Sequence, residues 1–150
     1  MSIDKDIKQA KFRTDHQRAI INIMYTHNWI TEQIKTIVEA EGITMQQFNI
    51  LRILRGSQEP LSTLQIRERM LDKMSDSSRI VDRLVLKSLA KKTIHKNDKR
   101  LVDITITEKG KKLLLQLDKQ EETFDKIIGC LSASEAKSLN VLLDKIRQSK

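Results

Sequence analysis

The sequence predicts a mainly α-helical fold that contains one small β-hairpin. Apolar residues recur at helical spacing along most of the chain. Several of these stretches open on Ser or Thr followed three residues later by Gln or Glu, the capping-box pattern of a helix start. Residues 101–107 differ, because aliphatic residues alternate there with Asp103 and Thr105, which is the period of a half-buried strand.

Length and composition predict one domain with an aliphatic core. The chain has 150 residues, of which 39% are hydrophobic but only 3% aromatic. A net charge of +8 favours a polyanionic partner, with nucleic acid as the first candidate and an anionic membrane surface as the second. The sequence shows neither an apolar run as long as a membrane span nor the apolar segment of a signal peptide, so we expect a cytoplasmic protein without a membrane partner.

The first predicted helix spans residues 14–40. Residues 1–13 are expected to form a charged arm, and Thr14 with Gln17 has the capping-box pattern. The apolar surface of this helix is wider than one neighbouring element would cover, which indicates burial on two sides. Gly42 is expected to end the segment.

Two shorter helices and a turn are predicted next. Thr44 and Gln47 open a helix that ends near Gly56, and Ser62 and Gln65 open another that reaches about residue 71. The only proline of the chain lies between them and marks the turn.

The stretch 74–107 is predicted to be a helix followed by the hairpin. The helix opens on small polar residues and buries an aliphatic stripe, and strands 93–96 and 101–107 follow around the turn 97–100. The segment 79–100 contains eight basic and two acidic residues, a net charge of +6 out of the +8 of the chain. A helix with a polar start can enter the major groove of DNA while a basic hairpin reaches the backbone or the minor groove. Together with the two preceding helices, this order predicts a winged helix-turn-helix DNA-binding unit over residues 44–107.

The same stretch resembles the winged-helix core of the MarR (multiple antibiotic resistance regulator) family. The family's wing pattern is D-x-R followed by a strand ending in L/I-T-x-x-G, and Asp98, Arg100 and residues 106–110 match it. The flanking helices also match in order and length, so the resemblance extends over nearly the whole chain. Ser88 departs from the pattern, because the family usually has Gly where the recognition helix ends, a position suited to a left-handed cap.

Two further helices are predicted after the hairpin. Thr107 is the expected N-cap of a long helix that runs to about residue 128, and Ser132 with Glu135 opens the last helix. The apolar stripes of 14–40 and 108–148 lie outside the DNA-binding unit and must be buried against another apolar surface. A second subunit is the simplest source of that surface, and the resemblance also implies that these helices form a dimer. The alternative is a monomer in which the three helices bury one another's apolar stripes.

The start of the recognition helix supplies the predicted base contacts. Serine hydroxyls can meet either kind of base edge, and Arg79 can bind guanine through two hydrogen bonds. Ser75 or Ser77 can instead cap the helix, and either arginine can instead pair with an acid such as Asp82. The candidate DNA-binding residues of the helix are Ser75, Asp76, Ser77, Ser78, Arg79 and Arg83.

The hairpin tip supplies a second predicted contact with DNA. An aspartate two residues before an arginine can orient the guanidinium by an ion pair, so that it meets phosphate or the minor groove already positioned. The resemblance implies this role for Asp98 and Arg100, and Lys96 and Lys99 are expected to add unspecific attraction to phosphate. A solvated charged turn is the alternative.

A small-molecule site is implied by the resemblance alone. Family members bind small aromatic or anionic effectors in a crevice between the dimer helices and the winged unit. His27, Trp29 and Phe48 are the candidate lining residues.

Other chemistry has little support in the sequence. His16, His27 and His95 are scattered without metal-ligand spacing, so we expect no metal and no cofactor. Cys130 is the only cysteine, so an intrachain disulfide is excluded. We expect Cys130 to be a packed, unreactive thiol rather than an oxidant sensor. We find no catalytic motif and expect no enzyme activity.

The sequence therefore predicts a transcription regulator that binds double-stranded DNA. We expect a homodimeric repressor that binds a pseudo-palindromic operator and is released by a small effector. A sequence-tolerant architectural DNA-binding protein without an effector is the alternative.

Overall fold

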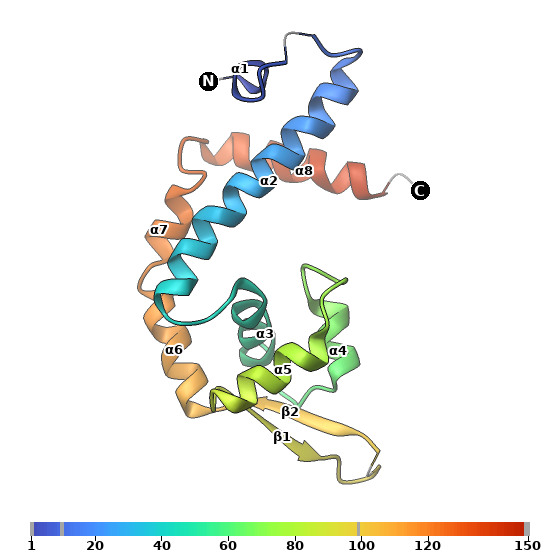
Figure 1. Ribbon diagram of the computed structural model, residues 1–150, viewed down its shortest axis with the longest axis vertical. Coiled ribbons are helices and arrows are strands. Elements are labelled where there is room, and N and C mark those ends of the chain that lie inside the picture. The colour runs from blue at the N-terminus through green and yellow to red at the C-terminus, as the bar shows by residue number, and fades with distance from the viewer. Residues whose placement is uncertain (1, 10, 99, 149–150) are drawn as a thin grey trace.

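The computed structural model describes residues 2–9, 11–98 and 100–148, and it confirms the predicted fold class. The chain is mostly helical and carries one two-stranded antiparallel sheet (Figure 1). The elements in chain order are α1 (Ile3–Asp6), α2 (Asp15–Ala40), α3 (Met45–Arg55), α4 (Thr63–Arg69), α5 (Ser77–Leu86), β1 (Ala90–Ile94), β2 (Val102–Ile106), α6 (Glu108–Asp118), α7 (Glu121–Lys126) and α8 (Ala133–Gln148).

The core of the molecule lies in the unit formed by α3, α4, α5 and the hairpin. Helix α5 buries Val81 and Leu84, which pack with residues of α3, α4 and the sheet. Ile104 of β2 is fully buried and also forms a two-hydrogen-bond bridge to Leu61, so a third short extended segment lies at the edge of the hairpin. The sequence had placed only a turn before α4, and the bridge completes the small sheet of a winged helix.

The predicted helix starts are confirmed. Thr14 caps α2, and complete capping boxes stand at Thr44 of α3 and Ser62 of α4. The Thr107 side chain accepts a hydrogen bond from the Gly110 N–H at the start of α6, and Ser132 exchanges hydrogen bonds with Glu135. These bonds join residues three apart, which is why sequence spacing alone finds them.

Three predicted boundaries are corrected. The first strand begins at Ala90 rather than residue 93, because the buried Ala90 pairs with the half-buried Ile106 at the end of β2. The predicted long helix from Thr107 is interrupted after Asp118, so α6 and α7 are separate. The predicted arm of residues 1–13 includes the short helix α1, whose Ile3 is buried and whose Asp4 forms an ion pair with Arg18 of α2 at 2.8 Å.

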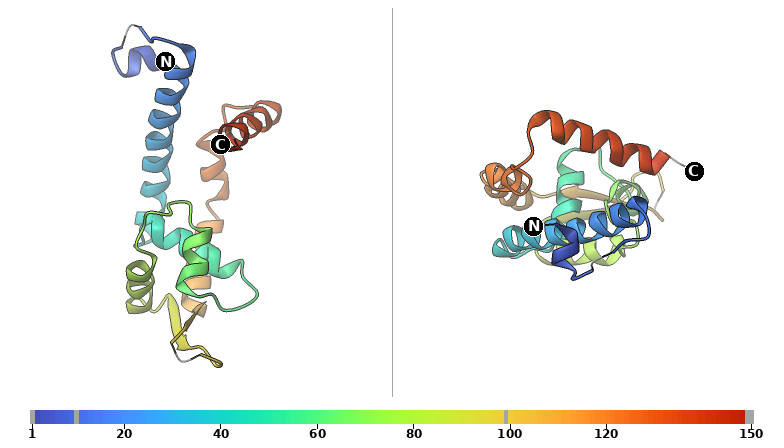
Figure 2. Two further views of the ribbon diagram at one scale, coloured as in Figure 1. Left: turned by 90° about the vertical axis from the view of Figure 1, so that its right-hand side faces the viewer. Right: turned by 90° about the horizontal axis from the view of Figure 1, so that it is seen from above.

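Two of the outer helices, α2 and α8, bury few side chains within the chain. Helix α2 and the α6–α7 segment rise from the unit, and α8 crosses above it, apart from α2 (Figures 1 and 2). Val38 is the only fully buried residue described in α2, and α8 has none over its described length. The large apolar residues exposed on α2 and α8 are Ile20, Ile23, Met24, Tyr25, Trp29, Leu139, Val141, Leu142 and Ile146.

Ser88 adopts the left-handed conformation that the family's usual glycine would favour. Its φ is 59°, and it follows the C-cap of α5 at Lys87. The Leu89 N–H donates to the Leu84 carbonyl at 2.9 Å and the Ser88 N–H donates to the Val85 carbonyl at 2.8 Å, the two bonds of a Schellman motif. The departure from glycine therefore leaves the backbone geometry intact and places a Cβ in a strained region.

Ser88→Gly is expected to stabilise the protein by about 1 kcal/mol, because glycine adopts positive φ without the Cβ penalty. The hydrogen bond at Ser88 uses its backbone carbonyl, so the substitution removes no described side-chain bond. The free energy of unfolding from urea titration measures the effect. Ser88→Ala keeps the Cβ and should show no gain, and a glycine variant less stable than wild type would contradict the strain at this position.

Candidate nucleic-acid interface

The start of α5 is shaped by hydrogen bonds within its own turn. Asp76 is the N-cap, and its carboxylate accepts from the Arg79 N–H at 3.1 Å. The Ser75 hydroxyl donates to the Asp72 carboxylate at 2.6 Å. This bond, followed by one from the Met74 N–H, lowers the pKa of Asp72 below its ordinary value. The cap is therefore Asp76, whereas the sequence had favoured Ser75 or Ser77 for that role.

Ser77 requires a correction. Its side chain is buried, with 4% exposed, and its hydroxyl donates to the Met70 Sδ at 3.2 Å. The first turn of α5 packs against the end of α4 on this side, so the Ser77 hydroxyl faces the core and is not placed to meet a base. Ser78 is the exposed serine of the pair.

Two arginines of α5 face a groove between the starts of α3 and α5. The groove has a volume of about 280 Å³ and is lined by Arg79 and Arg83 together with Thr44, Gln46, Gln47, Ser75, Asp76 and Ile80. Asp82 pairs with Lys92 of β1 rather than with either arginine. Within the described part of the chain, neither guanidinium has an ion-pair partner. Both cations are therefore open to an external anion, and α5 lies with the hairpin at the end of the molecule away from α8 (Figure 1).

The hairpin tip holds the predicted Asp98–Arg100 pair. Arg100 Nε donates to Asp98 Oδ1 at 3.1 Å and Nη2 donates to Oδ2 at 3.0 Å, while the Arg100 N–H adds a third bond to Oδ1 at 3.0 Å. The guanidinium lowers the pKa of the Asp98 carboxyl below its ordinary value, so the pair stays ionised at neutral pH. The Arg100 side chain is 89% exposed and points its free edge to solvent. Lys96 is also exposed, and Lys99 lies outside the described residues.

A second side-chain hydrogen bond in the hairpin, between His95 and Asp103, was missed by the sequence analysis. His95 Nδ1 lies 2.9 and 3.1 Å from the two carboxylate oxygens of Asp103. Asp103 is paired with Thr93 in the strand register, so His95 reaches it diagonally across the hairpin. The contact depends on which residues of the two strands lie opposite each other, and residue spacing along one strand does not give that register.

The three candidate effector residues are not brought together in this chain. His27 lines a cavity of about 270 Å³ with residues of α3 and the α4–α5 turn. Trp29 lines another cavity on the opposite side of α2, near α1 and Cys130. Residues two apart in a helix point about 200° from each other, which separates the pair. Phe48 lines a third cavity, so within one chain the three residues lie at three separate cavities.

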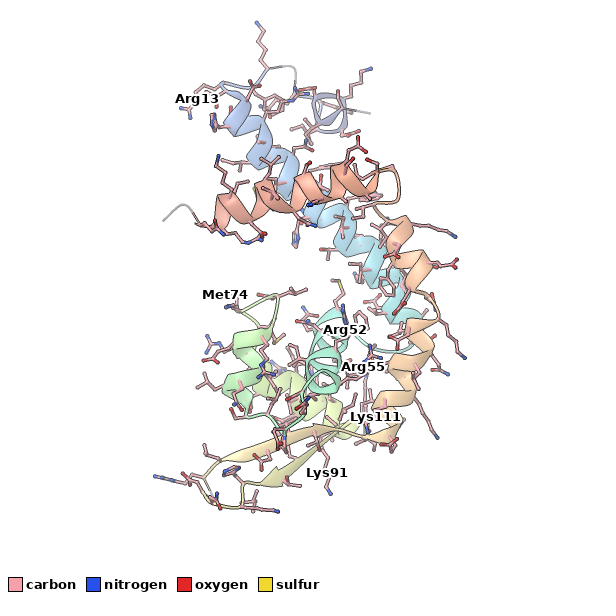
Figure 3. The ribbon with its side chains drawn as sticks, turned by 180° about the vertical axis from the view of Figure 1, so that it is seen from behind. Arg13, Arg52, Arg55, Met74, Lys91 and Lys111 are labelled. Carbon is pink, nitrogen blue, oxygen red and sulfur yellow. The ribbon has the colours of Figure 1, made fainter. Side chains whose placement is uncertain are left out.

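The cavity at Phe48 combines aromatic and charged groups. It has a volume of about 310 Å³ between α3 and the α6–α7 segment. The rings of Phe48 and Phe124 stack with centroids 5.9 Å apart, and the Arg52 guanidinium lies 5.6 Å from the Phe48 centroid. Arg55 forms a two-bond ion pair with Asp118 of α6 at 2.6 and 3.0 Å. Arg52 and Arg55 both extend from α3 (Figure 3).

The remaining candidates of the sequence analysis are the single cysteine and the histidines. Cys130 is exposed and not packed, contrary to the expectation of a buried thiol. Among the described residues, no group of His, Cys, Asp and Glu side chains is arranged to hold a metal ion. No described helix is both long and apolar enough to span a membrane.

Comparison with known proteins places the chain among bacterial transcription regulators. No family model matches the chain. It is 30% identical over 118 residues to the uncharacterized HTH-type transcriptional regulator YpoP of Bacillus subtilis, covering 78% of this chain and 82% of YpoP. The MarR transcription factor of Planctomyces limnophilus is 29% identical, with a TM-score of 0.68 over 89% of this chain and 98% of that one.

Two other solved structures share the fold and belong to proteins with a known ligand. A cysteine-to-serine mutant of E. coli MarR, complexed with operator DNA, has a TM-score of 0.76 at 22% identity, over 83% of this chain and 89% of that chain. Bordetella bronchiseptica BpsR, whose DNA binding is regulated by 6-hydroxynicotinic acid, has a TM-score of 0.73 at 20% identity, over 84% and 96% of the two chains.

The helix-turn-helix formed by α4 and α5, with the adjoining basic hairpin, defines a winged helix-turn-helix DNA-binding protein. The chain belongs to the MarR family of transcription regulators. Its relatives are regulators of transcription and not enzymes.

Proposed function

We propose that the protein is a repressor that binds a pseudo-palindromic operator as a homodimer and is released by a small effector. The observation that carries this proposal is the pairing of two surfaces at opposite ends of the molecule. One end carries exposed cations on α5 and the hairpin, and the other carries exposed apolar residues on α2 and α8. A dimer joined through the second end would present two winged units, residues 44–107 of each subunit, to one face of a duplex. We call these two DNA-binding units the reading heads.

The apolar surface is the support for the dimer body. Leu142 is 59% exposed and Val141 60%, and both lie in the regular helix α8. An amphipathic helix without an apolar partner is costly in water, and soluble monomers rarely expose such patches. We therefore assign residues 14–40 and 108–148 to dimerisation and 44–107 to DNA binding.

The proposed contacts with DNA divide between the two grooves. We propose that the exposed side chains of Ser78, Arg79 and Arg83 enter the major groove from the start of α5, with Ser75 and Asp76 at its rim. Arg100, oriented by Asp98, would meet phosphate or the minor groove of the same half-site. Lys96 and Lys99 would add attraction to phosphate without reading sequence. Two such heads must stand roughly 34 Å apart, one turn of B-DNA, to bind both half-sites together.

Arg79→Ala tests the regulator against the architectural alternative. The operator is first obtained by selecting bound sequences from a random DNA pool, and a two-fold symmetric consensus is expected. Affinity is then measured by fluorescence anisotropy on the selected duplex and on a scrambled one. We expect the variant to lose about 1–3 kcal/mol more on the operator than on the scrambled duplex, because a two-bond contact with guanine is specific.

Lys96→Ala is the matched control, since it removes an exposed cation of the hairpin that is expected to touch phosphate only. The Lys96→Ala variant should bind both duplexes more weakly, to a similar degree, and its affinity should depend less on salt concentration. Equal losses on both duplexes for Arg79→Ala would instead favour a sequence-tolerant architectural protein.

The effector is proposed to bind in the cavity at Phe48. Stacked aromatic rings with Arg52 alongside suit a small planar molecule that carries a polar or anionic group. The cavity lies between α3 of the winged unit and the α6–α7 segment of the dimer body, so occupancy could favour one spacing of the heads over another. A panel of aromatic carboxylates that left operator binding unchanged at millimolar concentration would argue against this site.

A further inference from the structure

The residues that follow the recognition helix form a junction between the winged unit and the outer helices. We call Lys87, Ser88 and Leu89 the elbow. The polypeptide enters the winged unit from α2 and leaves it into α6, so these two helices are its covalent connections to the proposed dimer body. Hydrogen bonds join the elbow both to the α2–α3 turn and to the start of α6.

The first connection is made by the Lys87 side chain. Its Nζ donates to the Gly42 carbonyl at 2.6 Å and to Gln47 Oε1 at 3.3 Å. Gly42 lies just beyond the end of α2, where its φ of 73° is one that glycine adopts without a Cβ penalty. Gln47 is buried, with 3% exposed, and its Oε1 also accepts the Thr44 N–H at 3.1 Å in the capping box of α3. The Lys87 ammonium therefore links the end of the recognition helix to the α2–α3 turn.

The second connection is made by the start of α6. The Thr107 hydroxyl donates to the Ser88 carbonyl at 2.7 Å, and Lys109 Nζ donates to the Lys87 carbonyl at 3.0 Å. The Thr107 N–H donates to the Leu89 carbonyl at 3.1 Å. Bonds from α6 thus reach all three residues of the elbow.

We propose that the elbow sets the angle between the recognition helix and the dimer body, with Lys87 as a positioning residue for operator binding. The inference rests on the proposed homodimer. A charge-assisted bond from a single ammonium to two acceptors holds the end of α5 against the α2–α3 turn. Without it, the end of α5 remains held by α6 but can swing relative to α2. The two reading heads of a dimer would then accept a wider range of separations.

This role predicts a change in spacing selectivity rather than a simple loss of affinity. Each added base pair moves one half-site by about 3.4 Å along the duplex and rotates it by about 34°, given 10–10.5 base pairs a turn. A rigid dimer should therefore bind its selected operator at least about tenfold more tightly than the same operator with one base pair inserted between the half-sites. A dimer with a loosened elbow should show a smaller ratio.

The experiment measures dissociation constants on three duplexes: the selected operator and the versions with one base pair inserted or deleted at its centre. The full-length proteins compared are wild type, Lys87→Met and Lys112→Met. Lys112 is an exposed lysine of α6 without a described hydrogen bond, so its variant is the matched control for loss of a charge. We expect Lys87→Met to reduce the spacing ratio to threefold or less, and Lys112→Met to keep the wild-type ratio.

Lys109→Met, which removes the bond from α6 to the Lys87 carbonyl, is a second variant and should also lower the ratio. It serves as the decisive variant if Lys87→Met does not fold, as judged by circular dichroism. A uniform loss of affinity on all three duplexes with the ratio unchanged would overturn the elbow's role and identify Lys87 as a phosphate contact. A wild-type protein with no spacing preference would instead refute the proposed dimer, and the inference with it.

Discussion

Gly110→Ala is expected to destabilise the protein by about 3 kcal/mol or more. A Cβ added at Gly110 would lie 2.4 Å from the Leu89 carbonyl oxygen and 2.8 Å from Ile106 Cγ1. The first contact is with backbone, which cannot move without displacing the elbow and the hydrogen bonds that hold it. Overpacking of a buried position against main chain is among the few single substitutions that cost this much. Urea denaturation followed by circular dichroism measures the loss.

Gly56→Ala is the matched control for this prediction. Gly56 is the C-cap of α3, where its φ is −77° and the nearest heavy atom to an added Cβ is the Arg52 carbonyl oxygen at an ordinary 3.4 Å. We expect a change within about 1 kcal/mol there. If Gly110→Ala were as stable as Gly56→Ala, the close approach of α6 to the elbow would be contradicted.

Leu142→Glu is expected to convert the protein into a monomer and to weaken operator binding by roughly 10²–10⁴-fold. Leu142 is 59% exposed on α8, and the dimer proposal places it in an apolar interface where a carboxylate would be desolvated without a described cation to pair with it. Loss of the second head removes the gain in affinity from simultaneous binding, which accounts for the size of the effect. Light scattering gives the mass, and anisotropy on the selected operator gives the affinity.

Leu64→Glu provides the comparison for Leu142→Glu. Leu64 is 65% exposed on α4, outside the helices assigned to dimerisation, and undergoes the same change from apolar to acidic. This variant should keep the dimer mass. Wild-type protein that already runs as a monomer, or a dimer that tolerates Leu142→Glu, would show that α8 does not form the subunit interface.

The hairpin shows which contacts of the candidate site can be predicted from local sequence and which cannot. Asp98 and Arg100 are two residues apart in a tight turn, so their ion pair follows from spacing and is present in the structure. The His95–Asp103 pair spans the hairpin, and it depends on a strand register that periodicity did not place correctly. The burial of Ser77 against Met70 likewise depends on how α4 packs against α5. Residue spacing alone could not tell which of Ser77 and Ser78 would be buried.

The sequence by itself determined the helix starts, the hairpin with its charged tip, and the concentration of positive charge between Arg79 and Arg100. These features depend on contacts between residues a few positions apart, for which residue type and spacing are sufficient. Only the tertiary structure decided which side chains of α5 remain exposed, where α6 is interrupted, and that His27, Trp29 and Phe48 face three different cavities. It also decided that the Lys87 ammonium donates to the Gly42 carbonyl in the α2–α3 turn, and that Lys87, Ser88 and Leu89 accept hydrogen bonds from the start of α6. The physical reason is that packing joins segments tens of residues apart, and no local pattern records which surfaces will meet.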